Sequence, residues 1–415
     1  MPLETPPDPV IGQRYLLVSH IPIYVDETGT YGTDPLWHKD LVGHFRYIKR
    51  FTLAAPVVRD WPAGTKAFTM ADKAGASVEF LPLPLTCSLP QNVLALPRVV
   101  SRLWSGVKAS DVVHVGVTAG PIPHGWIAGP LARLLRKFLI VIVESSPWRA
   151  EKDASLRKRV RGGVNEWVAH RLCNLATVSF YTQSEYQHRY LKDPSKGYIN
   201  SASWIDDEVI LSPEEAALSW REKSIPQRPL RVGLFSRLVA GKGVLVLIEA
   251  MKRLEQRGVS ICLDIYGNGE LLEVCEEAAK CGAVSATVSV CGTLAYDASF
   301  FAAIRQYHAV VVPSLTEEQP RIVFDAFSQA VPCLASDTSG LRQCIDEGVN
   351  GRLTRAGDDV ALADLLEWAA RDRASLERMG INALAAARAL THRKMHSDRC
   401  AILVEKLAAF ACPKT

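Results

Sequence analysis

Short apolar runs alternate with longer amphipathic stretches along the whole chain. This alternation is typical of a parallel β-sheet covered by helices. In the first half, the apolar runs predict strands at 15–19, 51–55, 78–83, 112–117, 139–144, 177–182 and 197–199. The amphipathic stretches between them predict helices at 34–48, 94–104, 124–136 and 154–172.

Residues 212–229 interrupt this rhythm, because they hold three prolines, many charges and few apolar residues. We interpret them as an interdomain linker. The rhythm then restarts, with strands predicted at 230–235, 261–266, 287–291, 309–312 and 332–336. Helices are predicted at 244–257, 270–280, 297–306, 322–329, near Arg342, at 359–371, and over 374–407 with a break near Thr391. The fold class is therefore α/β, with two doubly wound domains at 1–211 and 230–391.

Composition narrows the function classes. A chain of 415 residues with 48% apolar residues suits two or three globular domains. A net charge of +4 is too small to suggest a nucleic-acid-binding protein. The charge is uneven, since residues 1–210 hold 24 Lys+Arg against 19 Asp+Glu. Such a mild excess is compatible with an anionic membrane surface or an anionic substrate.

Other sequence features favour a cytoplasmic location for the protein. No apolar run approaches the ~20 residues of a membrane span, and residues 1–9 lack the basic and apolar regions of a signal peptide. Ten scattered cysteines contain no C-x-x-C pair, so zinc and redox motifs have no support, and buried thiols are the expected state.

The first candidate site is the segment 236–243, which follows the first strand of the second domain. A glycine-bearing loop between a strand and a helix places backbone amides where an anion is favoured. Arg237 adds a planar guanidinium with paired N–H donors, and Lys242 adds a compact ammonium charge. Together they suit a diphosphate. The alternative is two solvated cations beside a turn.

The second candidate is 267–270, which opens the helix after the next strand. It fails as a dinucleotide fingerprint, because Leu272 stands at the third glycine position. A tight strand-to-helix turn is the favoured interpretation, with close approach of a ligand as the alternative.

The third candidate, 313–326, runs from a strand end through a polar loop into a helix. Glu317 lies on the loop and Asp325 lies eight residues later on the helix, so both carboxylates can face one cleft at different depths. One suits sugar hydroxyls and the other a ribose diol, while the free amides near 321–323 suit phosphate. On spacing alone, exposed loop acids and an ordinary helix aspartate fit equally well.

These motifs, with 290–292, 313–314, Gly340 and 348–351, occur in the order and approximate spacing of glycosyltransferase family 4, which the chain resembles most over 230–355. That family has the GT-B fold, in which two Rossmann-like domains face each other across a cleft. It transfers a sugar from a nucleotide sugar with retention of configuration. The resemblance implies an acceptor-binding domain at 1–211, the linker at 212–229, a donor-binding domain at 230–391, and a C-terminal helix, 392–415, that crosses back onto the first domain.

The resemblance also assigns roles to residues. Arg237 and Lys242 match the pair that grips the donor diphosphate, and Glu317 matches the acid near the anomeric centre. We therefore expect these three to be catalytic. Asp325 matches the acid that holds the ribose hydroxyls. The other expected donor-binding residues are Gly32, Gly267, Gly292, Thr293, Leu294, Gln319, Pro320, Arg321, Ile322 and Val323.

The chain departs from the family pattern at several positions. The second acid is Asp325 and not glutamate, and Ser339 and Gln343 replace a glycine and an acid. Many members carry a histidine where this chain has Glu144.

No D-x-D motif is present, which suits the metal-independent GT-B class, so no metal and no cofactor besides the nucleotide-sugar co-substrate are expected. The expected function is a metal-independent retaining hexosyltransferase acting on a glycan or lipid-linked acceptor, with peripheral contact with the inner face of a membrane and no nucleic-acid partner. The alternatives are a catalytically silent GT-B subunit acting as a scaffold or binding module and, less favoured, a GT-B epimerase or an oxidoreductase.

Overall fold

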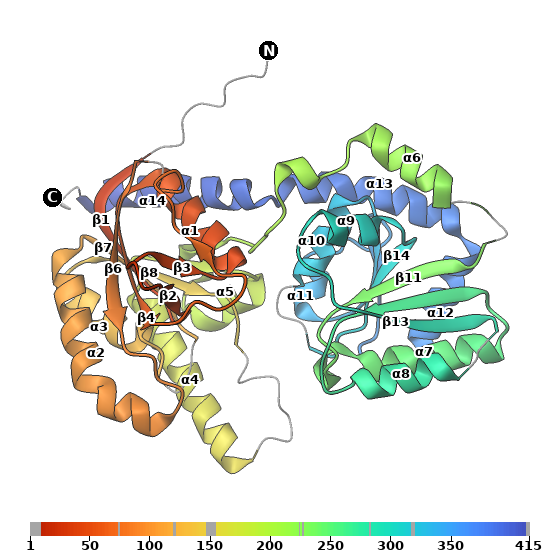
Figure 1. Cartoon of the computed structure of the whole chain (residues 1–415), viewed down its shortest axis with the longest axis horizontal. Coiled ribbons are helices and arrows are strands. Elements are labelled where there is room, and N and C mark those ends of the chain that lie inside the picture. Colours follow the sequence, from red (N-terminus) through yellow and green to blue (C-terminus); the bar gives the residue numbers. More distant parts are fainter. Residues whose placement is uncertain are drawn as a thin grey trace. The chain divides into compact units, whose positions relative to one another are not determined.

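The computed structural model describes residues 10–411 except 74, 119–121, 147–154, 224, 226–227, 282–283 and 317–319. Two compact units divide the chain (Figure 1). The first contains Met1–Ala202 together with Arg393–Thr415, and the second contains Ser203–His392.

A mostly parallel sheet forms the centre of the first unit. Its strand order is β10-β9-β8-β7-β1-β4-β2-β3-β5, with β6 also paired to β4. The β2–β3 and β3–β5 pairs are antiparallel. The strands are β1 (Ile11–Val18), β2 (Ile23–Val25), β3 (Tyr31–Thr33), β4 (Ile48–Val58), β5 (Lys66–Ala67), β6 (Ser77–Leu83), β7 (Val112–Gly116), β8 (Phe138–Val143), β9 (Val178–Tyr181) and β10 (Gly197–Ile199).

Helices cover both faces of this sheet, because successive residues of a strand point to opposite sides. Tyr15 and Leu17 of β1 share a core with Phe45 and Leu403, whereas Leu16 of the same strand packs in a second core. The first core lies under α1 (Pro35–Tyr47) and α14 (His392–Ala411), and the second lies under α2 (Leu89–Ala109), α3 (Gly125–Leu134), α4 (Leu156–Leu175) and α5 (Ser184–Tyr190).

The second unit has a wholly parallel sheet in the order β13-β12-β11-β14-β15-β16. Its strands are β11 (Leu230–Phe235), β12 (Ile261–Tyr266), β13 (Ala286–Gly292), β14 (Ala309–Val312), β15 (Cys333–Ser336) and β16 (Gly351–Thr354). Its helices are α6 (Pro213–Lys223), α7 (Val244–Gln256), α8 (Leu272–Lys280), α9 (Ala298–Arg305), α10 (Arg321–Ser328), α11 (Ser339–Arg342), α12 (Asp359–Arg371) and α13 (Arg373–Ala389). Val311 and Val312 of β14 point into separate cores on the two faces of the sheet.

The predicted α/β fold with two doubly wound sheets is confirmed, and most predicted elements are present with shifts of a few residues at their ends. The predicted break near Thr391 falls between α13 and α14. Residues 212–229, predicted to be a linker, instead contain α6 and belong to the second unit. Trp220 of α6 is fully buried and donates a hydrogen bond to the carbonyl of Ala330, at 2.9 Å.

The described cysteines are all free thiols. Cys173, Cys275, Cys333 and Cys400 are buried, as expected, but Cys87, Cys281 and Cys291 are exposed. Their positions explain the difference, since Cys281 follows the last turn of α8 and Cys291 lies on the edge strand β13. Among the described helices, none combines the length and the apolar character needed to cross a bilayer.

Candidate functional site

The strand order of the second unit reverses between β11 and β14. The chain places β12 and β13 on one side of β11, and then returns to place β14 on the other side. In open α/β sheets, ligands bind at the carboxyl ends of the strands at such a reversal. The segment 236–243 follows β11, and 313–320, the loop part of the candidate segment 313–326, follows β14. Both belong to the segments singled out from the sequence.

These two segments contact each other directly. The amide of Leu315 donates to the carbonyl of Gly241, at 3.0 Å. Gly243 has φ +70°, and a Cβ there would lie 1.8 Å from the carbonyl oxygen of Pro313. Only glycine permits both this left-handed backbone and this close approach. Gly243 therefore allows the loop after β11 to lie against the loop after β14.

Two helices begin at this reversal, and neither begins with a side-chain cap from its N-cap residue. Gly243 precedes α7 and Pro320 precedes α10, and neither position provides a side-chain cap. Neither helix has an acidic residue in its first turn. Exposed amides and the helix dipole favour an anion at such ends.

Arg237 and Lys242 add positive charge to the same loop. Arg237 is exposed, whereas Leu238 beside it is buried and held by two backbone hydrogen bonds, from its amide to Asn268 and from the amide of Leu271 to its carbonyl. Lys242 is half-buried in a short 3₁₀ turn, Ala240–Lys242, directly before α7. The anchored leucine fixes the backbone from which Arg237 projects.

The segment 267–270 supports the loop after β11. A Cβ on Gly267 would lie 1.8 Å from the carbonyl oxygen of Ser236, and one on Gly269 would lie 2.4 Å from that of Leu238. The interpretation as a tight strand-to-helix turn is thus confirmed, and both glycines have a packing reason. The turn also meets β13, because the Gly267 amide donates to the carbonyl of Gly292, at 2.7 Å.

Asp325 is a buried carboxylate on α10. It is 5% exposed, and its Oδ1 accepts a hydrogen bond from the hydroxyl of Tyr296, at 2.8 Å. Burial, reinforced by the charge of Asp325, raises the pKa of Tyr296, which therefore stays protonated as the donor. Sequence reasoning missed Tyr296, because its position after β13 has no pattern that links it to a residue 29 positions later.

The remaining predicted donor residues of the second unit lie around the same strand ends. Val323 is buried in the core, Ile322 is half-buried, and the guanidinium of Arg321 lies 5.3 Å from the ring centroid of Trp204. Thr293 is exposed and Leu294 is half-buried, packed against the core under α10. Glu317 and Gln319 lie outside the described residues.

Gly32 belongs to the first unit, on β3. A Cβ there would lie 2.6 Å from the Trp61 ring and 2.7 Å from the carbonyl oxygen of Lys66. Close packing within the unit therefore accounts for glycine at this position. The predicted role of Gly32 in donor binding stays a prediction.

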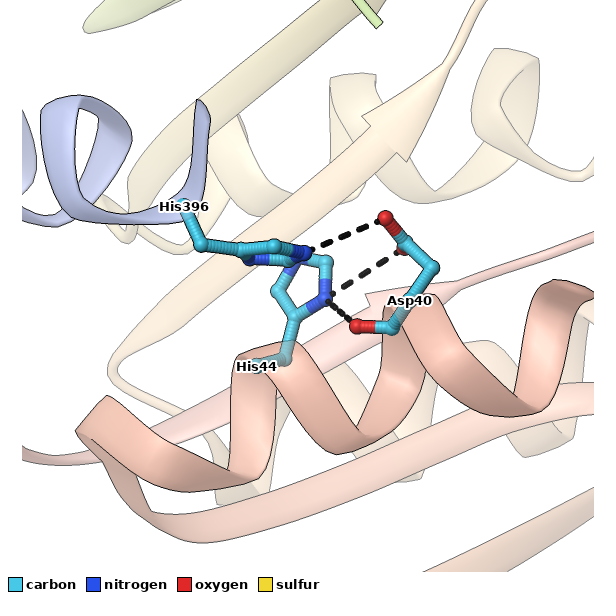
Figure 2. A group of neighbouring side chains, drawn as sticks. All are labelled: Asp40, His44 and His396. Atoms are coloured by element: carbon cyan, nitrogen blue, oxygen red, sulfur yellow. Dashed lines mark hydrogen bonds and ion pairs between the residues drawn. The ribbon is translucent and has the colours of Figure 1, made fainter. Parts of the chain in front are cut away.

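Among the described residues, one group has the spacing of metal ligands: Asp40, His44 and His396 (Figure 2). A guanidinium can only donate, so Nη1 of Arg399, at 3.2 Å, donates to Nε2 of His44. The proton of His44 is therefore on Nδ1, which faces the Asp40 carbonyl at 2.9 Å.

The same group joins α14 to α1. Nε2 of His396 lies 3.3 Å from Oδ1 of Asp40, and Arg399 also donates to Asn200 Oδ1, at 2.8 Å. Burial lowers the pKa of His396 to about 3, although Asp40 opposes the shift. A divalent cation beside Asp40 would bind Nδ1 of His44, so the imidazole proton would have to move to Nε2, which accepts from Arg399. The arrangement therefore fits a structural network better than a metal centre.

Comparisons with known proteins agree with this architecture. Residues 229–372 match the family model described as glycosyl transferases group 1. They include all the segments that meet at the β11–β14 reversal.

Two curated relatives carry glycosyltransferase names. The chain is 25% identical over 258 residues to alpha-D-kanosaminyltransferase of Streptomyces kanamyceticus, which covers 61% of this chain and 66% of the relative. It is 30% identical over 166 residues to the amylovoran biosynthesis glycosyltransferase AmsK of Erwinia amylovora, covering 38% of this chain and 39% of the relative. Each alignment spans less than two thirds of the relative.

A solved structure extends the likeness over nearly the whole chain. HepE of Anabaena, crystallised in complex with UDP, superposes with a TM-score of 0.65 at 17% identity, covering 94% of this chain and 100% of HepE. This likeness shows the fold, which is GT-B with two Rossmann-like domains.

Proposed function

We propose that this protein is a metal-independent retaining glycosyltransferase. It takes a hexose-type sugar from a nucleotide-diphosphate donor and transfers it to a hydroxyl of a glycan or lipid-linked acceptor. One observation carries the proposal: the loops after β11 and β14 meet where the strand order reverses, with two uncapped helix starts and two cations.

A nucleoside diphosphate is the ligand that this arrangement suits best. Its phosphate oxygens are acceptors without donors, and they complement the amides at the starts of α7 and α10. Arg237 and Lys242 supply the neutralising charge. HepE has been crystallised in complex with UDP and with UDP-glucose, which supports a nucleotide sugar as donor.

The same groups provide the catalytic stabilisation. When the bond to the anomeric carbon breaks, negative charge grows on the leaving diphosphate, and fixed positive groups lower the barrier most where that charge develops. In the proposed mechanism the leaving phosphate accepts the acceptor's proton during attack from the same face, which gives retention. Glu317 stabilises the positive charge that develops on the sugar.

Asp325 holds the ribose hydroxyls in this proposal. The Tyr296 hydroxyl fixes one oxygen of the carboxylate, so the group is oriented before the donor arrives. Hydrogen bonds to a charged partner contribute about 1.5–3 kcal/mol each, enough to make this contact measurable.

Nucleotide binding and turnover together test the proposal. UDP, GDP and ADP are titrated by calorimetry against the parent, Arg237→Ala, Lys242→Ala and the control Lys280→Ala, whose side chain is exposed beyond the site on α8. We expect each site variant to weaken the best-binding nucleotide by about tenfold or more, and the control to leave it unchanged.

Turnover is then measured with the corresponding nucleotide sugars, with and without EDTA. Sugar transfer or slow donor hydrolysis that persists in EDTA supports the enzyme. Nucleotide binding without any turnover would favour the alternative of a catalytically silent GT-B subunit. Equal nucleotide affinity in parent and site variants would refute the site, and activity that requires added Mn²⁺ or Mg²⁺ would refute metal independence.

A further inference from the structure

Helix α4 of the first unit exposes a continuous apolar stripe. Leu156, Val160, Val164 and Trp167 are separated by four, four and three residues, which places them on one side of an α-helix. Their exposed fractions are 76%, 61%, 48% and 61%. The buried contacts of α4 lie mainly in its second half, at Ala169, Leu172 and Cys173. In Figure 1 the first turns of α4 extend beyond the sheet.

Helix α2 exposes a second stripe of the same kind. The side of α2 that adjoins this stripe is buried against the sheet through Val99, Leu103 and Val107. The outward side carries apolar residues at helical spacing, each 36–56% exposed: Leu89, Val93, Leu96, Val100 and Trp104. Isolated exposed apolar residues are ordinary, but two ordered stripes that each contain a tryptophan are not.

Helix α3 lies between these two helices. It packs against both α2 and α4, and Leu134 near its end is 68% exposed. The three helices cover the same face of the sheet, since their buried residues share one core. The exposed apolar residues of α2, α3 and α4 therefore belong to one helical layer.

The charge of this layer is strongly one-sided. Together α2, α3 and α4 contain nine lysines and arginines and a single acid, Glu166. Four of the cations lie near the start of α4: Arg157, Lys158, Arg159 and Arg161. At roughly 100° per residue, Arg157 and Arg159 fall on opposite sides of the α4 stripe. Apolar residues flanked by cations are the pattern of a helix that lies in a membrane interface.

We infer that α2, α3 and α4 form a docking surface for an anionic lipid bilayer. The two tryptophans and the aliphatic residues enter the boundary between headgroups and acyl chains, and the flanking cations contact lipid phosphates. Charge argues against a second copy of this chain as the occupant, because two such surfaces would repel each other. The apolar stripes argue against nucleic acid, whose backbone would leave them exposed to water.

Vesicle co-sedimentation of the full chain tests the inference. The parent is mixed with phosphatidylcholine vesicles and with vesicles that also contain phosphatidylglycerol. We expect binding to the anionic vesicles to exceed binding to the neutral ones by about tenfold or more, because each cation near such a surface adds attraction.

Two pairs of variants separate the apolar from the charged contribution. Val160→Asn with Val164→Asn breaks the α4 stripe without changing its charge, and its control is Val360→Asn, at an exposed apolar position of α12 in the second unit. Arg157→Gln with Arg159→Gln removes charge, and its control is Arg221→Gln with Lys280→Gln in the second unit. We expect each test variant to lose most of the vesicle binding and each control to keep it.

Nucleotide affinity and melting temperature are measured on every variant, so loss of fold is distinguished from loss of docking. Unchanged nucleotide affinity with lost vesicle binding supports the surface. Absence of parent binding to anionic vesicles, equal binding to both vesicle types, or retained binding by the stripe variant would overturn it. So would dimerisation or RNA binding through the same residues.

Discussion

Gly243→Ala tests whether the contact between the loops after β11 and β14 builds the site. The new Cβ would lie 1.8 Å from the Pro313 carbonyl oxygen and 2.7 Å from its carbon. Real Cβ atoms stay beyond 3.0 Å, so one of the two loops has to move by at least 1.2 Å, from 1.8 to 3.0 Å. Such a shift would separate the start of α7 from the start of α10.

The expected cost has two parts. Alanine at φ +70° costs roughly 1–2 kcal/mol from the left-handed backbone alone. Overpacking at the Pro313 carbonyl adds about 1–3 kcal/mol. We therefore expect a loss of about 2–5 kcal/mol in unfolding free energy, and at least a tenfold loss of nucleoside diphosphate affinity, because the phosphate-binding amides are displaced.

Gly258→Ala is the matched control. Gly258 has φ +66°, almost the same backbone conformation, but a Cβ there meets nothing within 4 Å. This variant should lose only the roughly 1–2 kcal/mol of unfolding free energy that the left-handed backbone costs, and it should keep full nucleotide affinity. Urea unfolding gives the stability difference, and hydrogen exchange of peptides covering β11 and β14 locates it. If the two variants lose equal stability and both bind nucleotide like the parent, the contact does not organise the site.

Two further predictions concern buried polar groups. Asp325→Asn should lower nucleotide affinity by about tenfold with little loss of stability. Tyr296→Phe should lower the affinity less, because it only releases one carboxylate oxygen of Asp325. A fall in melting temperature without any change in affinity would make Asp325 purely structural. Burial lowers the pKa of His396 to about 3, below the ~6.5 of an unfolded histidine, so its stabilising contribution is complete above pH 6.5 and is lost as the pH falls towards 3. Between pH 7 and 5 this group alone should cost about 2 kcal/mol in urea unfolding, and a pH dependence that is identical in His396→Gln would contradict the assignment.

The sequence predicts the central strands well, because a strand covered on both faces is apolar at nearly every position. Leu230–Phe235, Ile261–Tyr266 and Ala309–Val312 therefore coincide with their predicted bounds. Several short strands carry no such signal, and β2, β3, β5 and β16 have no counterpart among the predicted strands.

The composition of residues 212–229 is compatible both with a linker and with a helix. Their prolines and charges were interpreted as a linker, but Pro213 stands at the start of α6, where proline suits a helix. Trp220 is the single large apolar residue on the buried side of α6. One buried aromatic side chain leaves too weak a periodicity to detect.

The candidate site was predictable where it depends on local order and unpredictable where it depends on distant contacts. The loop–helix junctions at Arg237, Lys242 and Asp325 are visible as motifs, but the Tyr296–Asp325 hydrogen bond joins two different βα units. The exposure of the α4 stripe also depends on the fold. Apolar residues at helical spacing usually predict a buried side, and only the fold shows that this side of α4 is exposed.

The proposed docking surface and the proposed donor site are both positively charged, but their positive groups differ. Ligand binding at the two sites should therefore depend differently on salt concentration. The docking surface of α2, α3 and α4 consists of exposed side chains, and salt at 0.15 M screens such charges over ~8 Å. The proposed donor site combines side chains with backbone amides at two helix starts, whose hydrogen bonds to phosphate do not depend on ionic strength in the same way. Raising NaCl from about 0.05 to 0.5 M should therefore weaken vesicle binding by a larger factor than nucleotide binding. Calorimetry and co-sedimentation on the same preparation give the two ratios. If nucleotide affinity falls as steeply as vesicle binding, then Arg237 and Lys242 act as exposed charges alone, and the helix starts contribute little.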